Sequence, residues 1–235
     1  MTNHNVICMI PARIGSQRFK QKNLALIENK TVLEWGIMAA KKSKIFDRII
    51  VNGDDSIFRD IAHKNDVDFF LRDKNLGSSE TKSDEVIIDF LNHFKGDFIV
   101  WFNAIAPLQR IDDIKNFVEV LSSKKYQSLF AVRSQYVQTL YNEKPLNFNY
   151  QQKFEKTQDL NPSKIFIPSL MGWNIKSFID NYHENGYGFF SGNVGYVEVS
   201  SLSSLVIKKE EDFRLIRSVV EGFKSYNSPI KYFSN

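Results

Sequence analysis

The sequence predicts an α/β fold in which a mainly parallel sheet carries helices on both faces. Short apolar runs, typical of buried strands, alternate with segments whose apolar residues recur every three to four positions, as on one face of a helix. Short loops join the two kinds of segment, and this alternation is the pattern of right-handed βαβ crossovers. The 235 residues, 43% of them hydrophobic, suffice for a substantial core. We therefore predict one domain over residues 1–235.

Strand-like runs dominate the first part of the chain. The apolar run Val6–Ile10 indicates a buried strand, and Asp97–Phe102 carries the strongest strand signal, ending before Pro107. The predicted strands are 6–10, 48–52, 67–71, 97–102 and 128–132, and the alternation resumes with a short strand at 205–207.

Helical periodicity marks the segments between these strands. Thr31 and Glu34 have the spacing of a capping box, and Ser83 is the expected cap of a later helix. Acidic residues at 210–212 suit the electropositive start of the last helix. The predicted buried faces contain Leu33, Gly36, Ile37 and Ala40; Ile57, Phe58, Ile61 and Ala62; Val86, Ile87, Phe90, Leu91 and Phe94; Ile111, Ile114, Phe117, Val118 and Leu121; and Phe213, Ile216, Val219, Val220 and Phe223.

The alternation stops between residues 135 and 187. Aromatic residues there are mixed with Asn, Gln and Pro, as in a projecting hairpin and loops. Apolar side chains outside the core periodicity usually mark an interface when they form a large exposed patch. We therefore predict that residues 135–187 are an inserted excursion through which the protein forms a homodimer.

A basic loop, which we define as residues 11–23, follows the first predicted strand. Pro, Gly and Ser interrupt regular structure after Ile10, and no acidic residue occurs before Glu28. Free backbone N–H groups and unpaired cations at a strand end suit a polyanion. A solvated basic loop is the plain alternative, but the preceding strand and the pair Gly15-Ser16 favour phosphate binding. The cations are Arg13, Arg18, Lys20 and Lys22.

Other loops are expected to gather beside the basic loop. Ligands of parallel sheets bind beyond the carboxyl ends of the strands. Besides the basic loop, three predicted loops follow the carboxyl ends of strands, namely residues 53–55, 72–83 and 103–110. The expected site therefore combines cations with polar side chains from neighbouring strands.

Composition excludes several other classes of protein. The net charge of +4 is too weak and dispersed to indicate nucleic-acid binding. Cys8 is alone, so the chain has no internal disulfide, and the four histidines lack metal-ligand spacing. The first residues lack a signal peptide's basic start, and no apolar run approaches the ~20 residues of a membrane span. We expect a cytoplasmic protein.

The stretch Ile10–Asn23 resembles the opening motif of the acylneuraminate cytidylyltransferases, the CMP-sialic acid synthetases. The motif is specific, and similarity continues through Val51–Ile57, Arg72–Val86 and Asn103–Gln109. This resemblance implies a nucleotide-diphospho-sugar transferase-like fold, homodimers formed through the irregular middle, and CMP transfer from CTP to a nonulosonic sugar acid. In-line transfer of this kind depends on positioning and on charge neutralisation.

The resemblance also implies roles for individual residues. Arg13 and Lys22 match positions that hold the triphosphate, and Arg72 matches one near the base and ribose. Asn103 and Gln109 fall on the side that binds the sugar. The remaining residues expected to bind nucleotide are Ala12, Gly15, Ser16, Arg18 and Asn23.

Departures from the family motif concern the metal and the acceptor. The two Asp residues that hold magnesium in the family are replaced here by Val206 and Lys208. We therefore expect no protein-held metal, Mg²⁺ that enters with the nucleotide, and Lys208 taking over part of the ion's role. Asn103 is shorter than the family's Gln, and Ile105-Ala106 replaces Thr-Ser.

Two alternatives stay open. Asn103, Ile105 and Ala106 also suit a related nucleotidyltransferase with a different acceptor. Val206 and Lys208 also suit a catalytically silent nucleotide-binding homologue. The identity of the sugar acid does not follow from the sequence.

Overall fold

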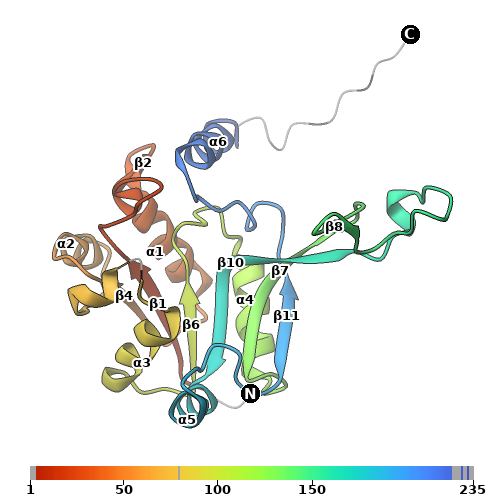
Figure 1. Ribbon diagram of the computed structural model, residues 1–235. Helices are drawn as coiled ribbons and strands as arrows, with labels where there is room; N and C mark the ends of the chain where they lie inside the picture. The colour runs from red at the N-terminus through yellow and green to blue at the C-terminus, as the bar shows by residue number, and fades with distance from the viewer. Residues whose placement is uncertain (1–3, 79, 224–228, 230–231, 233–235) are drawn as a thin grey trace.

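One twisted sheet organises the protein in the computed structural model, which describes residues 4–78, 80–223, 229 and 232. Its strands are β1 (Val6–Ala12), β4 (Arg48–Gly53), β5 (Asp68–Leu71), β6 (Phe98–Phe102), β7 (Ser128–Gln135), β10 (Ser163–Asn174) and β11 (Val194–Glu198). Their order is β11-β7-β10-β6-β1-β4-β5 (Figure 1). Only β10 runs antiparallel to its neighbours, so the prediction of a mainly parallel sheet is confirmed.

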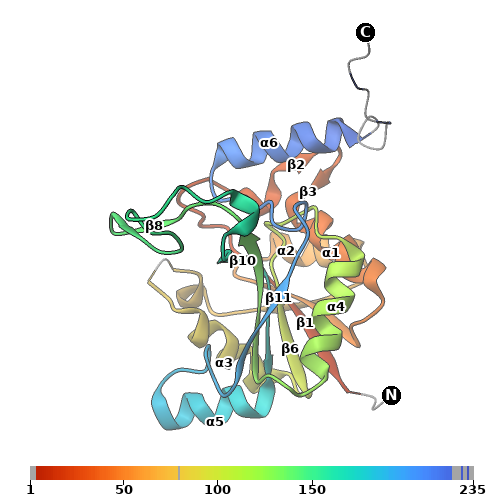
Figure 2. The same ribbon diagram turned by 90° about the vertical axis from the view of Figure 1, so that its right-hand side faces the viewer.

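Helices cover both faces of the sheet, as predicted (Figure 2). Helices α1 (Val32–Ser43), α2 (Ile57–Lys64) and α4 (Ile111–Ser122) pack on one face, and α3 (Ser83–His93) and α5 (Ile175–Asn185) on the other. Successive residues of β1 point to opposite faces: Cys8 joins the first of these cores and Met9 joins the second. A central parallel strand is buried on both sides, which explains its uninterrupted apolar run.

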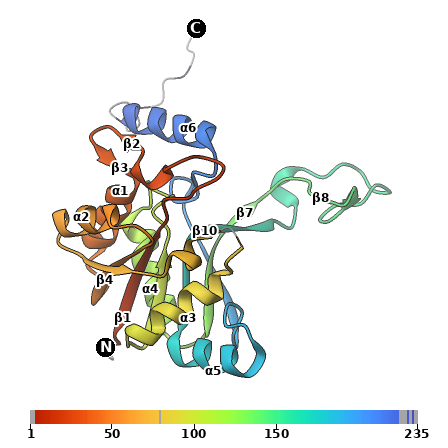
Figure 3. The same ribbon diagram turned by 60° about the vertical axis from the view of Figure 1, so that its left-hand side comes forward.

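A third apolar cluster lies above the carboxyl ends of the strands. Helix α6 (Glu210–Glu221) packs there near the short strands β2 (Leu26–Ile27) and β3 (Lys30–Thr31) (Figure 3). Phe213 of α6 meets Phe19 of the basic loop with ring centroids 5.4 Å apart. The last helix therefore helps to position the loop that begins where β1 ends.

The start of α1 follows the prediction closely. The Thr31 hydroxyl accepts a hydrogen bond from the Glu34 amide (3.1 Å), and the Glu34 carboxylate accepts one from the Thr31 amide (2.7 Å). On the buried face of this helix, a Cβ added to Gly36 would lie 2.7 Å from the Cβ of Ala104. Glycine at this position lets α1 approach the turn that follows β6.

The predicted cap of α3 is off by one residue. Ser83 is the first helical residue, and Lys82 is the N-cap, its amide donating to the Glu85 carboxylate at 3.2 Å. The acidic residue of the first turn thus satisfies the amide of the N-cap residue.

The strand predicted at residues 205–207 is wrong, and β11 was not predicted. Ile207 makes a single backbone hydrogen bond to the carbonyl of Ile105 (2.8 Å), and its buried side chain joins the cluster beneath α6. The apolar residues there pack against a helix, whereas β11 alternates outward-facing and buried residues at the edge of the sheet.

The projecting excursion is shorter than residues 135–187. The chain returns at Ser163 into β10, which lies between β7 and β6, and continues into α5 on the sheet. The register of β10 against β7 shifts between Phe166 and Met171, a stretch that contains Pro168. Because proline lacks the ladder donor and favours such irregularities, the periodicity of this strand is hidden in the sequence.

What projects is the arm, which we define as residues 136–162 (Figure 3). It contains the hairpin of β8 (Leu140–Tyr141) and β9 (Lys144–Pro145) and the short helix η3 (Thr157–Asp159). Several of its large apolar side chains are exposed, up to 82% for Phe154.

Candidate functional site

A cavity of about 440 Å³ lies at the carboxyl ends of β1, β5 and β6. Three of the four loops expected to converge line it: the basic loop, the segment after β5 and the segment after β6. The fourth, after β4, contributes Asp54 behind the lining. The lining residues are Pro11, Ala12, Arg13, Ser16, Arg18, Lys22, Asn23, Arg72, Leu76, Ser78, Thr81, Ser83, Val86, Trp101, Asn103 and Ile105.

Three cations of the basic loop face this cavity without a carboxylate partner. Among the described residues, the guanidinium groups of Arg13 and Arg18 have no hydrogen-bond or ion-pair partner. The Lys22 ammonium donates to the carbonyl oxygen of Ile207 at 3.0 Å. Burial, together with Arg18 and Arg13, lowers the pKa of Lys22 to about 8, against a weaker opposite effect of Asp212. The uncompensated positive charge makes the cavity suited to a polyanion.

Two polar side chains of the basic loop are buried at the cavity wall. Asn23, in the short helix η1 (Lys22–Leu24), donates to the carbonyl oxygen of Arg13 at 3.2 Å. Its own carbonyl oxygen has no partner in the described part of the chain. Ser16 is also buried, and its amide donates to the carbonyl of Ile14 at 3.0 Å, which turns the chain there.

Gly15 is exposed at the tip of this turn. A Cβ added to it meets no atom within 4 Å, and its φ is not positive. The fold itself therefore does not require glycine at this position.

We expect Gly15→Ala to separate folding from binding. The free energy of unfolding should change by less than ~0.5 kcal/mol, as for surface substitutions. Affinity for CTP should fall about tenfold if the backbone lies against the phosphates, because a methyl group then prevents that approach. Chemical denaturation and titration calorimetry measure the two effects. Unchanged CTP affinity would show that no ligand approaches residue 15.

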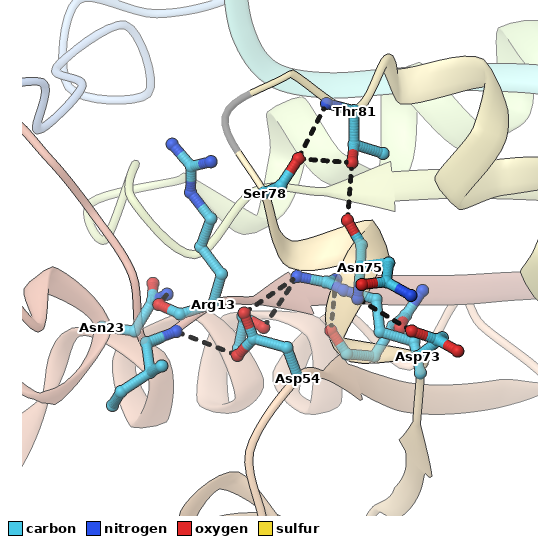
Figure 4. A network of polar contacts seen from close by, with 11 residues as sticks. Arg13, Asn23, Asp54, Asp73, Asn75, Ser78 and Thr81 are labelled. Atoms are coloured by element: carbon cyan, nitrogen blue, oxygen red, sulfur yellow. Dashed lines mark hydrogen bonds and ion pairs between the residues drawn. The ribbon is translucent and has the colours of Figure 1, made fainter.

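Arg72 lies at the floor of the cavity, but its guanidinium is largely engaged by the protein. Its Nη1 donates to the carbonyl of Asn52 at 3.0 Å, and its Nη2 donates to the carbonyl of Ala12 at 3.2 Å. The Asp54 carboxylate is 3.8 Å away, within the network of Figure 4. Burial lowers the pKa of Arg72, and Asp54 opposes this effect.

Hydroxyl groups form a second wall that was not singled out from the sequence. The hydroxyl oxygens of Ser78 and Thr81 are 3.0 Å apart, and the Thr81 hydroxyl donates to the backbone carbonyl of Asn75 at 2.9 Å (Figure 4). The run of Ser and Thr before α3 was the available signal, since such residues commonly fold back on their own backbone.

The two residues expected on the sugar side take different positions. Asn103 lines the cavity, as does Ile105. Gln109 does not, and its amide group donates instead to the Asn103 carbonyl at 3.3 Å. Trp101, which was not predicted, also lines the cavity, and its indole N–H is buried without a partner among the described residues.

The segment expected to replace a metal site lies at the edge of the cavity. Lys208 is exposed and is not among the lining residues. The acidic residues that follow are engaged elsewhere: Asp212 accepts the amides of Lys208 and Lys209 (both 2.8 Å), and Glu210 pairs with Arg214. In the described ranges no three His, Cys, Asp or Glu residues are grouped to hold a metal ion. The carboxylates of Glu210 and Asp212 are therefore engaged by the protein itself.

No helix in the described part of the chain is both long and apolar enough to span a membrane.

Comparison with known proteins adds to this geometry. A protein-family model described as "Cytidylyltransferase" matches residues 7–167. The N-acylneuraminate cytidylyltransferase of Escherichia coli O18:K1:H7 is 26% identical over 193 residues, which are 82% of this chain but only 43% of that protein. The chain thus spans less than half the length of this relative.

One further relative and one solved structure match along most of the chain. The CMP-N,N'-diacetyllegionaminic acid synthase of Campylobacter jejuni is 28% identical over 248 aligned residues, covering 92% of this chain and 94% of that protein. A structure of CMP:2-keto-3-deoxy-manno-octonic acid synthetase complexed with CTP matches with a TM-score of 0.72 at 10% identity, covering 92% of this chain and 98% of that chain. At this identity the likeness concerns the fold alone.

Proposed function

Because the chain belongs to the cytidylyltransferase family, we propose that it transfers CMP from CTP to the anomeric hydroxyl of a nonulosonic, sialic-acid-like sugar acid, releasing pyrophosphate. One observation carries the proposal. Arg13, Arg18 and Lys22 are brought together without a carboxylate at the carboxyl ends of parallel strands. A nucleoside triphosphate supplies the negative charge that this arrangement lacks.

The chemistry asks the protein for positioning and charge neutralisation. The anomeric oxygen attacks the α-phosphorus in line, a new O–P bond forms, the bond to the β-phosphate oxygen breaks, and the hydroxyl proton passes to solvent. Charge grows on the departing pyrophosphate, where Arg13 and Lys22 stabilise it. Asn103 and Trp101, on the side toward β10, are suited to bind the acceptor.

The test is release of pyrophosphate from CTP in the presence of a panel of sugar acids. We expect turnover with CTP and with at least one nonulosonic acid, and much lower turnover with ATP, GTP or UTP. Turnover with an acceptor of another class would favour the related nucleotidyltransferase. CTP binding without turnover for any acceptor would favour the silent homologue.

The names of the relatives guide the choice of acceptors. They specify N-acylneuraminate and N,N'-diacetyllegionaminic acid for those proteins. The panel therefore begins with these two acids, and Ile105 beside Asn103 makes acceptors with an apolar substituent worth including.

Magnesium belongs to this proposal as a companion of the nucleotide. Val206 and Lys208 stand where the family motif has its two magnesium-binding Asp residues, and Asp212 accepts backbone amides of its own segment. We propose that Mg²⁺ enters chelated by the triphosphate, and that Lys208 supplies part of the missing positive charge. Its backbone continues directly from Ile207, whose carbonyl binds Lys22.

Lys208→Ala should lower turnover several-fold and leave CTP affinity within about twofold, because the charge is needed when pyrophosphate departs. Steady-state kinetics at saturating Mg²⁺ measure this. Lys209→Ala is the matched control, since Lys209 is an exposed neighbour paired with Glu211. If both variants turn over like the wild type, Lys208 has no role and other groups supply the charge.

The exposed apolar side chains of the arm lead us to propose a two-fold symmetric homodimer. We expect a dimeric mass in light scattering at micromolar concentration, and a monomeric mass after Tyr141→Ser combined with Phe154→Ser, whose side chains are 68% and 82% exposed. Leu215→Ser, also exposed but on α6, is the control that should stay dimeric. A monomeric wild-type protein would refute the proposal.

A further inference from the structure

Three segments far apart in the sequence are joined at one buried ion pair below the basic loop. Asp54 follows β4 and Arg72 follows β5, and their side chains are only 7% and 4% exposed. The pair connects these two strand ends with the end of β1 and with the turn of the basic loop (Figure 4).

Arg72 holds the backbone of two strands. Its two terminal nitrogens donate to the carbonyls of Asn52 and Ala12, which lie at the ends of the neighbouring parallel strands β4 and β1. Each terminal nitrogen keeps a second N–H, and Nη2 lies 3.8 Å from the Asp54 carboxylate. Nε is buried and has no partner in the described residues. Backbone carbonyls and Asp54 therefore hold the guanidinium in place at the floor of the cavity.

Asp54 holds the basic loop from behind. One carboxylate oxygen accepts the amide of Ile14 at 2.9 Å, at the point where the chain turns toward Gly15 and Ser16 (Figure 4). Asp54 does not line the cavity itself. A Cβ added to Gly77 would lie 2.4 Å from its other oxygen, so the segment after β5 packs directly on this carboxylate.

We propose that Asp54 and Arg72 are positioning residues that hold the backbone of the basic loop in its phosphate-binding conformation, and that Arg72 acts through this backbone without contacting the nucleotide. The inference rests on the proposed function for the identity of the ligand, a triphosphate. It replaces the expected role of Arg72 as a contact to base and ribose.

Both members of the pair are required in this arrangement. Removal of one charge leaves the other buried without compensation. Lysine cannot replace Arg72, because one ammonium does not reproduce two divergent donors aimed at separate carbonyls. Asparagine at position 54 still accepts the Ile14 amide but no longer pairs with Arg72.

The change in anion affinity caused by Asp54→Asn distinguishes a positioning role of Asp54 from a purely electrostatic one. Removing a negative charge near a cation cluster should tighten anion binding if only the electrostatic field matters. A positioning role predicts the opposite, weaker binding, because the loop no longer holds its conformation. We expect tripolyphosphate and CTP affinity to fall about tenfold in both Asp54→Asn and Arg72→Lys.

The controls are taken from the same two strands. Arg48 and Asp68 form an ion pair with Nε and Oδ2 2.5 Å apart. They lie at the amino ends of β4 and β5, whereas Asp54 and Arg72 follow the carboxyl ends of these strands. Arg48→Lys and Asp68→Asn should leave both affinities unchanged. All variants are compared by calorimetry at a temperature where circular dichroism shows them folded. If the pair contributed only to the stability of the fold, the affinities of the folded variants would equal those of the wild type.

Hydrogen exchange of the ligand-free protein provides a readout that does not depend on the proposed function. Amides of residues 12–18 should exchange at least tenfold faster in Asp54→Asn and Arg72→Lys than in the wild type and the controls. Unchanged exchange there, or tighter tripolyphosphate binding by Asp54→Asn, would overturn the inference. A wild-type protein that binds neither CTP nor tripolyphosphate would instead refute the proposed function, and the exchange experiment would still decide the role of the pair.

Discussion

Replacing Arg13 or Lys22 by alanine should weaken CTP binding by roughly 10- to 150-fold for each residue, since a hydrogen bond to a charged group contributes ~1.5–3 kcal/mol. Both side chains face the cavity, and the guanidinium of Arg13 has no partner among the described residues. The free energy of unfolding should change little, because each substitution also removes repulsion between like charges. Titration calorimetry with CTP measures the affinity, and thermal unfolding measures stability.

Lys20→Ala is the control for these two variants. Lys20 is a cation of the same loop, but it is exposed and does not line the cavity. Its removal should change CTP affinity by no more than about threefold, the loss of a screened surface charge. If Arg13→Ala and Lys22→Ala bind CTP like the wild type, the cation cluster is not the triphosphate site and the proposed function loses its main support.

CTP binding should also weaken as the pH rises through about 8, the pKa of Lys22 in the free protein. Below this pH the ammonium is charged and contributes fully to binding. Above it, binding must first restore a proton, since a bound triphosphate raises the pKa of Lys22. Affinity at pH 9.5 should be about 30-fold lower than at pH 7, as expected when a pKa near 8 returns toward its usual value.

The pH dependence of folding stability has the opposite sign to the pH dependence of CTP binding. Because the folded protein holds the pKa of Lys22 below its usual 10.5, the unfolded chain binds more protons between pH 8 and 10.5. Lys22 therefore makes the ligand-free protein more stable as the pH rises through this window. Affinity and stability should thus move in opposite directions.

Two measurements test the pH effect. Calorimetry at pH 8 in buffers of different ionisation enthalpy should show proton uptake on CTP binding. Lys22→Arg stays charged throughout, so its affinity should be nearly independent of pH between 7 and 9.5. A wild-type affinity that is equally independent of pH would show that Lys22 does not titrate on binding.

Much of the fold was determined by local sequence alone. The run Val6–Ile10 forms a strand because a central parallel strand is apolar on both faces, and Thr31 with Glu34 starts α1 because each satisfies the other's backbone amide. The cations of the basic loop were also visible, since no acidic residue stands near them in sequence. In each case the physical cause acts over a few residues.

Tertiary structure alone decided which strand joins the sheet and what a polar residue contacts. β10 lies between β6 and β7 with Leu170 in one core and Trp173 in the other, although Pro168 and a register shift obscure its period. Ile207 packs under α6 although its neighbours read as a strand.

The roles of individual polar groups were decided in the same way. Arg72 holds carbonyls of two neighbouring strands, and Gln109 supports the backbone of Asn103. These contacts join residues up to 60 positions apart. Residue type and spacing identify a candidate donor, but only the packing of distant segments determines whether that donor meets a ligand or the protein's own backbone.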